Sequence, residues 1–266
     1  MLHQIDISDL QLNWNAISRN AGELAVLVFL LVCWRVKLLR AHWPAFFLLS
    51  AFFVLAGLSG ARLFSLFNIS LSRGVAFQWD LLLKNPGFGA LRWNGSMLLY
   101  ALFLPVVLLA ISSVSRWKSF DLFALSTCLF IVFVKLGCQF SGDGCYGIPT
   151  TLPWGMHYEW GIRPSRLPVH PTPLYDSFFH LLFFVYLLRR WKSGAPDGRT
   201  GLLFFVGSAG FCFLLECIRV NTPVALGLTL AQWTYLAILP ICWLTNQYRI
   251  FSMQTDHNLK PALPCY

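Results

Sequence analysis

The sequence predicts an all-α, polytopic integral membrane protein, a single membrane-embedded domain over residues 1–266 with about seven transmembrane helices. Three observations predict this class. The chain is 57% hydrophobic and 12% charged, against roughly 45–50% and about 25% in an average soluble domain. Apolar runs recur along it, and they are continuous rather than alternating with a period of two, which argues against a barrel. Because lipid cannot hydrogen-bond to the backbone, runs of about 20 residues cross it as helices.

Seven apolar segments are long enough to span a bilayer. They cover residues 18–34, 45–68, 96–114, 120–137, 173–189, 201–218 and 227–246. The connections after the first, third and fifth segments are short and basic, and contain Arg35, Arg116 and Arg189. The positive-inside rule therefore predicts that the N-terminus lies outside and the C-terminus in the cytoplasm. The outside loops are then about residues 69–95, 138–172 and 219–226.

The net charge of +9 comes from 20 Lys and Arg residues that are scattered between hydrophobic segments. Without a basic tail or a recognition motif, this pattern indicates topology signals and contact with anionic lipid, and no nucleic acid partner. The eight cysteines fall mostly inside apolar segments and show no CxxC spacing. The pattern favours packing over metal binding, so no metal and no cofactor are expected.

A glycine-rich, polar stretch interrupts the apolar pattern between residues 135 and 175. It is much longer than an ordinary connection between helices, and its glycines let the backbone approach a substrate closely. Its polar side chains are Lys135, Asp143, Tyr146, Arg163, Arg166 and His170. We expect the functional site there, on the outer face of the membrane.

Charged residues inside the predicted spans point to the same face. Burying one costs at least about 2.5–3.5 kcal/mol, yet Arg62, Lys135 and Glu216 lie near the outer ends of the second, fourth and sixth segments. They are predicted to form one site. Two alternatives remain open: Arg62 reaches the headgroups by snorkelling, or Glu216 pairs only with Arg219, three residues later.

His170 opens the run HPTPLYD, which begins a predicted helix. Thr172 is expected to cap this helix, with Pro173 at its first position and Asp176 in the first turn. At the mouth of the helix His170 is placed to act as a base or to hold a headgroup; the alternative is a hydrogen bond within the loop. His180, four residues after Asp176, is expected to make a structural hydrogen bond.

Two runs, KLGCQFSGDGCYGIPTTLPWGM and RLPVHPTPLYD, resemble the signature of the bacterial prolipoprotein diacylglyceryl transferases. The likeness continues, in the same order, at residues 58–67, 92–97, 213–219 and 228–233. The resemblance implies a multi-pass enzyme of the bacterial inner (plasma) membrane. Such an enzyme moves a diacylglyceryl group from phosphatidylglycerol to the lipobox cysteine thiol of a prolipoprotein, and so serves lipoprotein biosynthesis. Its partners are then phosphatidylglycerol, the prolipoprotein signal peptide and the lipid bilayer.

This chemistry explains the types of residue in the stretch. A thiol attacks as its thiolate, so a base or a positive field is needed, and we expect His170, Asp143 and Glu216 to be the catalytic candidates. The phosphate of the leaving group gains negative charge, which cations stabilise. The expected substrate-binding residues are Lys135, Arg62, Asn94, Gly142, Tyr146, Tyr175 and Arg219.

The chain departs from the family pattern at five places: Asn94 replaces histidine, Lys135 arginine, Cys138 asparagine and Cys212 arginine, and the N-terminal tyrosine of the family is missing from residues 18–24. Lys135 keeps the charge without the bidentate geometry of arginine, and Asn94 is no general base. Either other residues carry out the same transfer, or the reaction has changed. The alternatives are a related membrane lipid transferase with a different donor or acceptor, and a non-catalytic lipid-binding protein on the same scaffold.

Overall fold

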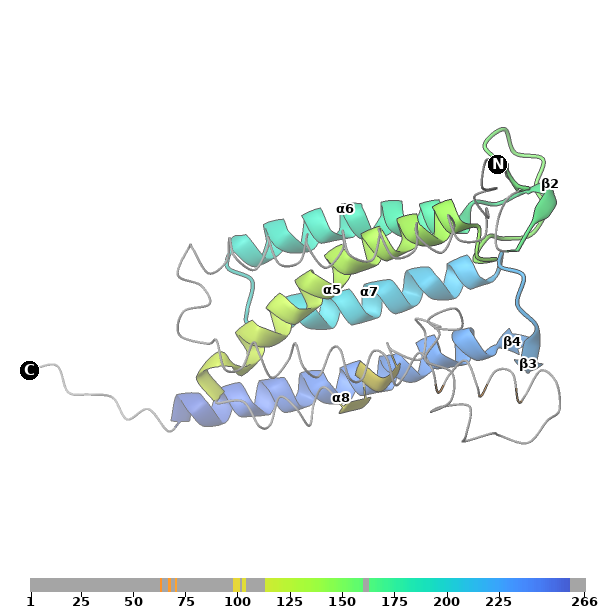
Figure 1. Ribbon diagram of the computed structural model, residues 1–266. Helices are drawn as coiled ribbons and strands as arrows, with labels where there is room; N and C mark the ends of the chain where they lie inside the picture. Colours follow the sequence, from red (N-terminus) through yellow and green to blue (C-terminus); the bar gives the residue numbers. More distant parts are fainter. Residues whose placement is uncertain are drawn as a thin grey trace, which may run out of the picture. The chain divides into compact units, whose positions relative to one another are not determined.

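The computed structural model describes residues 63, 67, 70, 98–100, 102–103, 113–159 and 163–258, and it is mostly helical there (Figure 1). The long helices are α5 (Ser113–Ser141), α6 (Thr172–Lys192), α7 (Arg199–Glu216) and α8 (Leu230–Asn258). They overlap the last four predicted segments and confirm that most of each segment is helical, although residues 217–218 and 227–229 are not. The three earlier segments and the predicted loop at 69–95 lie wholly or largely outside the described residues.

Two of the described helices are long and apolar enough to cross a membrane, over Arg116–Ser141 and Arg199–Glu216. Their composition explains this property, because long runs of Leu, Phe and Val carry few charges. Helix α6 ends in Arg189, Arg190 and Lys192, and basic residues suit the last turn of a helix.

The prediction of an all-α chain holds for the long elements and needs correction in the connections. Two small antiparallel sheets form there, one from β1 (Met156–Tyr158) and β2 (Ser165–Val169), the other from β3 (Pro223–Ala225) and β4 (Leu228–Thr229). The second hairpin turns at Leu226 and Gly227, both with positive φ (49° and 72°), as two-residue hairpin turns require. These stretches have no helical periodicity, and backbone pairing across a tight turn satisfies their polar groups instead.

The chain forms two compact units. One consists of Met1–Arg40, Ala124–Gly194 and Phe211–Thr222, and the other of Ala41–Phe123, Ala195–Gly210 and Pro223–Tyr266. Helices α5 and α7 each run from one unit into the other. The glycine-rich stretch belongs entirely to the first unit. The expectation of one domain over residues 1–266 stays a prediction.

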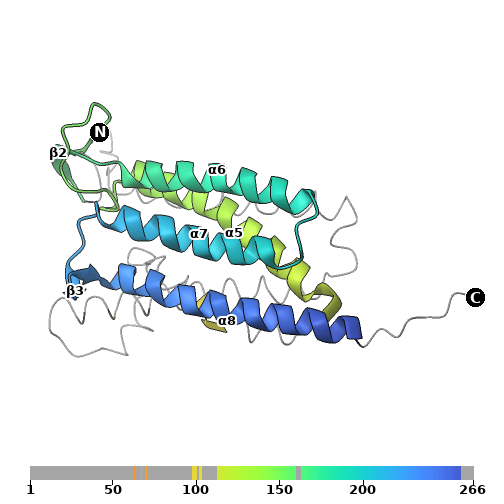
Figure 2. The same ribbon diagram turned by 180° about the vertical axis from the view of Figure 1, so that it is seen from behind.

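In the first unit, α6 packs along the second half of α5 (Figures 1 and 2). The Ser177 hydroxyl donates a hydrogen bond of 3.0 Å to the Val132 carbonyl, and the Cys128 thiol donates one of 3.3 Å to the His180 carbonyl. Phe179 stacks on Phe211 of α7 with ring centroids 3.8 Å apart. These contacts place the first turns of α6 opposite the last turns of α5.

In the second unit, a buried carboxylate binds the start of α7. Asp121 on α5 accepts hydrogen bonds from the backbone N–H groups of Gly198 (2.8 Å) and Gly201 (2.7 Å). Amide groups in the first turn of a helix lack intrahelical partners, so a carboxylate there satisfies them and suits the helix dipole. Gly201 also permits close packing, since a Cβ atom would lie 2.6 Å from the Phe120 ring.

Candidate active site

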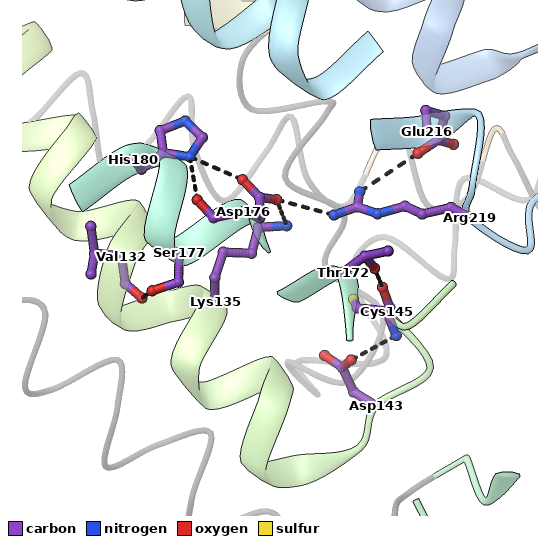
Figure 3. Close-up of polar contacts among 10 residues, drawn as sticks. All are labelled: Val132, Lys135, Asp143, Cys145, Thr172, Asp176, Ser177, His180, Glu216 and Arg219. Atoms are coloured by element: carbon purple, nitrogen blue, oxygen red, sulfur yellow. Dashed lines mark hydrogen bonds and ion pairs between the residues drawn. The ribbon is translucent and has the colours of Figure 1, made fainter. Parts of the chain in front are cut away.

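A network of buried charges is centred on Asp176, in the second turn of α6 (Figure 3). One carboxylate oxygen, Oδ2, lies 2.8 Å from Lys135 Nζ on α5 and 3.0 Å from Arg219 Nη2. The other, Oδ1, lies 3.0 Å from His180 Nδ1. Lys135 is 6% exposed and Asp176 is 1% exposed. Two cations therefore converge on a single carboxylate oxygen away from water.

Glu216 extends this network from the last residue of α7. Its Oε2 lies 3.6 Å from Arg219 Nη1, and its Oε1 accepts a hydrogen bond of 2.7 Å from Asn221 Nδ2. Glu216 contacts Arg219, but the alternative that it pairs only with Arg219 is wrong, because Asn221 also donates to Glu216 and Arg219 also contacts Asp176. The four charged side chains, two positive and two negative, balance one another in a setting where an unpaired charge is costly.

A close backbone approach positions Arg219. Gly147 and Arg219 form an isolated antiparallel bridge, and the Ile148 N–H donates to the Ile218 carbonyl at 2.8 Å. A Cβ atom on Gly147 would lie 2.5 Å from that carbonyl oxygen and 2.9 Å from His170 Cβ. Only glycine allows this contact, which joins the glycine-rich stretch to the segment that follows α7.

Two cysteines and an aspartate gather at the end of α5. Potential donor atoms of Cys138, Asp143 and Cys145 all lie within 4.8 Å of one another. The Cys145 N–H donates to Asp143 Oδ1 at 3.0 Å, and the Thr172 hydroxyl donates to the Cys145 carbonyl (Figure 3). A hydrogen bond from the Cys138 thiol lowers the pKa of Cys145.

An aromatic pair connects the same loop to the first hairpin. Tyr146 and Tyr158 stack with centroids 4.9 Å apart. The Tyr146 hydroxyl donates to the Arg163 carbonyl (2.9 Å), and the Tyr158 hydroxyl donates to Gln139 Oε1 (2.7 Å). Burial raises the pKa of Tyr158 to about 12. These bonds hold the hairpin over the end of α5.

His170 belongs to a third group. Its Nδ1 lies 3.3 Å from the Tyr175 hydroxyl, which also accepts a hydrogen bond of 2.8 Å from Trp154 Nε1. Trp154 is 54% exposed. With Gly155, Met156, Pro171 and Leu174, the Trp154 and Tyr175 side chains line an apolar cavity of about 600 Å³.

The predicted site residues thus fall into distinct groups. Lys135, Glu216 and Arg219 share the Asp176 network, Asp143 contacts Cys145, Tyr146 contacts the hairpin, and His170 contacts Tyr175. Gly142 forms the turn after α5, with φ of 55°. Arg62 and Asn94 lie outside the described residues.

Two expectations around α6 have different outcomes. The structural role of His180 is confirmed, since its Nδ1 bonds the Asp176 carbonyl at 2.9 Å. The cap at Thr172 is wrong: the helix begins at Thr172 with Pro171 as its N-cap. The Thr172 hydroxyl bonds the Cys145 carbonyl instead, because the preceding loop folds back over this end of the helix.

Sequence reasoning missed the central role of Asp176. It considered this residue only for its effect on the helix dipole and as a neighbour of His180. The signal was present, because Asp176 is another ionisable residue inside an apolar segment, and such a residue calls for a partner of opposite charge.

Comparisons of the sequence with known proteins identify its family. The family model for prolipoprotein diacylglyceryl transferase matches residues 3–245. A phosphatidylglycerol–prolipoprotein diacylglyceryl transferase of Nostoc sp. is 26% identical over 223 residues, covering 73% of this chain and 75% of that protein. The protein of the same name from Parasynechococcus marenigrum is 27% identical over 190 residues, 65% of this chain and 64% of its own length.

A shorter match is more similar. The Leptospira interrogans protein of the same name is 36% identical over 94 residues, 34% of this chain and 29% of its own length. No solved structure gives a significant match. Since the family model covers nearly the whole chain, including the helix that holds Lys135 and the segment that holds Arg219, this protein belongs to the prolipoprotein diacylglyceryl transferase family.

Proposed function

We propose that this protein transfers a diacylglyceryl group from phosphatidylglycerol to the lipobox cysteine thiol of a prolipoprotein. The observation that carries the proposal is the convergence of Lys135 and Arg219 on one carboxylate oxygen, at 2.8 Å and 3.0 Å, next to a partly exposed glycine-rich loop. Two cations held this closely provide a binding place for the single phosphate of the lipid headgroup.

The reaction forms a carbon–sulfur bond and breaks the bond between the glycerol carbon and the phosphate oxygen. The electron pair leaves with the glycerol phosphate, whose negative charge Lys135 and Arg219 stabilise. Asp176 keeps both cations in place before the lipid arrives, so little reorganisation is needed when the headgroup binds.

The thiol proton must pass to a base. Glu216 is engaged by Arg219 and Asn221, which suits a role in positioning Arg219. Asp143 and His170 are both half-buried, and they are our candidates for the base. Gly142, Tyr146, Tyr175, Arg62 and Asn94 complete the proposed substrate-binding set.

The proposed topology follows from charge and length. Seven helices cross the inner membrane of a bacterial cell, with the N-terminus outside and the C-terminus in the cytoplasm. The apolar spans at Arg116–Ser141 and Arg199–Glu216 support this arrangement. It places the stretch from 138 to 172 on the outer face, where a secreted prolipoprotein presents its cysteine.

The test is transfer of labelled diacylglyceryl groups from phosphatidylglycerol to a lipobox peptide, in membranes that contain the protein. Lys135→Ala and Arg219→Ala should each lower the rate about 100-fold, as the loss of one stabilising donor does elsewhere. Arg166→Ala, which removes an exposed cation from the same loop, is the matched control and should leave the rate within about twofold, since exposed charges contribute little. If the peptide cysteine is never modified in a system that supports a known transferase, the proposal is wrong.

A further inference from the structure

The end of α5 brings together three donor groups that suit a thiophilic metal ion. Cys138 lies in the last turn of α5, and Asp143 and Cys145 follow it within seven residues. Their donor atoms lie within 4.8 Å of one another, and all three residues are partly exposed. Zinc bonds of about 2.3 Å to sulfur, at tetrahedral angles, place two sulfur atoms about 3.8 Å apart. Adjustments of about an ångström or less therefore complete such a site.

The loop that follows α5 already holds these donor groups close together. Gly142 (φ 55°) and Gly144 (φ 89°) flank Asp143 in the left-handed region and turn the chain back toward α5. A Cβ atom on Gly144 would overlap Cδ of Arg163. The hydrogen bond from the Cys145 N–H fixes Asp143 Oδ1, as groups in the surroundings of metal sites orient their ligands.

The charges around the cluster also fit. Two thiolates and one carboxylate carry a charge of −3, and a divalent ion reduces it to −1. A second group of donors, Asp176, His180 and Cys212, also comes together. Its carboxylate already contacts Lys135, Arg219 and His180, so no metal is needed to balance its charge.

We propose that Cys138, Asp143 and Cys145 bind a zinc ion, and that the sulfur of the acceptor cysteine becomes its fourth ligand. The role of the acceptor sulfur as the fourth ligand rests on the proposed function. Among the described residues, the cluster supplies three donors, and three protein ligands leave one tetrahedral position for a substrate atom.

The chemistry balances without an oxidant. Each thiol that binds zinc releases its proton. With Asp143 bound to zinc, His170 is left as the candidate base that takes the proton of the acceptor, which is then held as the thiolate that attacks. Its sulfur then forms the bond to the glycerol carbon, while the electron pair of the broken carbon–oxygen bond leaves with the glycerol phosphate. The zinc ion stays divalent throughout. The site supplies a reactive thiolate in a chain whose Asn94 is no general base.

Metal content tests the site without reference to activity. The full-length protein is purified in detergent with a phosphine reductant, supplied with zinc and then dialysed. Its zinc content is measured by elemental mass spectrometry. We expect one zinc ion per chain. Cys138→Ser, Cys145→Ser and Asp143→Asn should each weaken zinc binding at least about tenfold. Cys217→Ser, at an exposed cysteine just after α7, is the matched control and should bind zinc like the wild type.

Cobalt substitution of the wild-type protein tests the fourth position and does not depend on any variant. The sulfur-to-cobalt charge-transfer band should grow when a lipobox peptide is added, and should not change when the peptide carries serine in place of cysteine. An unchanged band with both peptides overturns the role of the acceptor. Absence of zinc from the wild type, equal loss in Cys217→Ser, or a Cys138–Cys145 disulfide in protein purified without the reductant overturns the site.

The two proposals fail in different ways. If the protein binds zinc but never modifies the peptide cysteine, the metal site stands and the proposed transferase function is wrong. If transfer continues at full rate after a chelator has removed all zinc, the function stands and the catalytic role of the metal is wrong.

Discussion

Replacing Asp176 with asparagine tests the charge network directly. The change keeps the shape of the side chain and removes the negative charge that faces Lys135 Nζ at 2.8 Å and Arg219 Nη2 at 3.0 Å. At an effective dielectric constant of about 20, each contact contributes roughly 5–6 kcal/mol of Coulomb energy, much of which offsets the cost of burying the ions. Leaving buried cations without their partner should therefore lower the free energy of unfolding by about 3–5 kcal/mol.

The measurement is the free energy of unfolding in mixed detergent micelles. A double-mutant cycle with Lys135→Met separates the pairing from other effects, because the double variant leaves Arg219 opposite Glu216 with no net charge. We expect it to be more stable than the sum of the single changes predicts, by at least about 1 kcal/mol. Lys192→Met, at an exposed position in the last turn of α6, is the control for loss of a lysine. Additive effects, or an Asp176→Asn protein as stable as the wild type, would refute the reasoning.

Two further changes test the loop and the hairpin by the same measurement. Gly144→Ala should lower the free energy of unfolding clearly more than Gly194→Ala. Both glycines have positive φ (89° and 83°), but only the added Cβ at Gly144 would overlap Arg163. The control, Gly194→Ala, should lose about 1 kcal/mol from backbone strain alone, and equal losses would contradict the clash. Tyr158→Phe should cost about 1 kcal/mol through the lost hydrogen bond to Gln139. Because burial raises the pKa of Tyr158 from 10 to about 12, the unfolded chain loses this proton at a lower pH than the folded protein does. The difference from Tyr158→Phe should therefore be constant below pH 10 and shrink between pH 10 and 12.

The positions of the long helices could be predicted from the sequence because each is one continuous apolar run. The run at 120–137 lies within α5, and that at 173–189 within α6. The helix ends were less predictable. Thr172 and Pro173 have the composition of a cap followed by a first turn, yet the Thr172 hydroxyl is taken by Cys145, 27 residues earlier. Such long-range competition leaves no local signal.

The candidate site was predictable as a set of charges and not as a set of contacts. Lys135 and Glu216 stand out in the sequence because ionisable residues are rare in apolar segments, and Arg219 stands out because it follows Glu216 by three residues. Their meeting at Asp176 depends on how α5, α6 and the end of α7 pack, which periodicity does not encode. Likewise, the spacing of Cys138 and Cys145 matches no common metal motif, so the sequence predicts that these cysteines pack in the protein interior and does not predict that they bind a metal. Their proximity follows from the two turns at Gly142 and Gly144.

The stacking of Phe211 on Phe179 fixes a point on α7 close to the last residue of that helix. From Phe211 to Glu216 the helix advances about 7.5 Å at 1.5 Å per residue. Adding or removing one residue between them would move Glu216 by about 1.5 Å along the axis and about 100° around it. The number of residues between Phe211 and Glu216 therefore matters to the charge network as much as the identity of the charged residues.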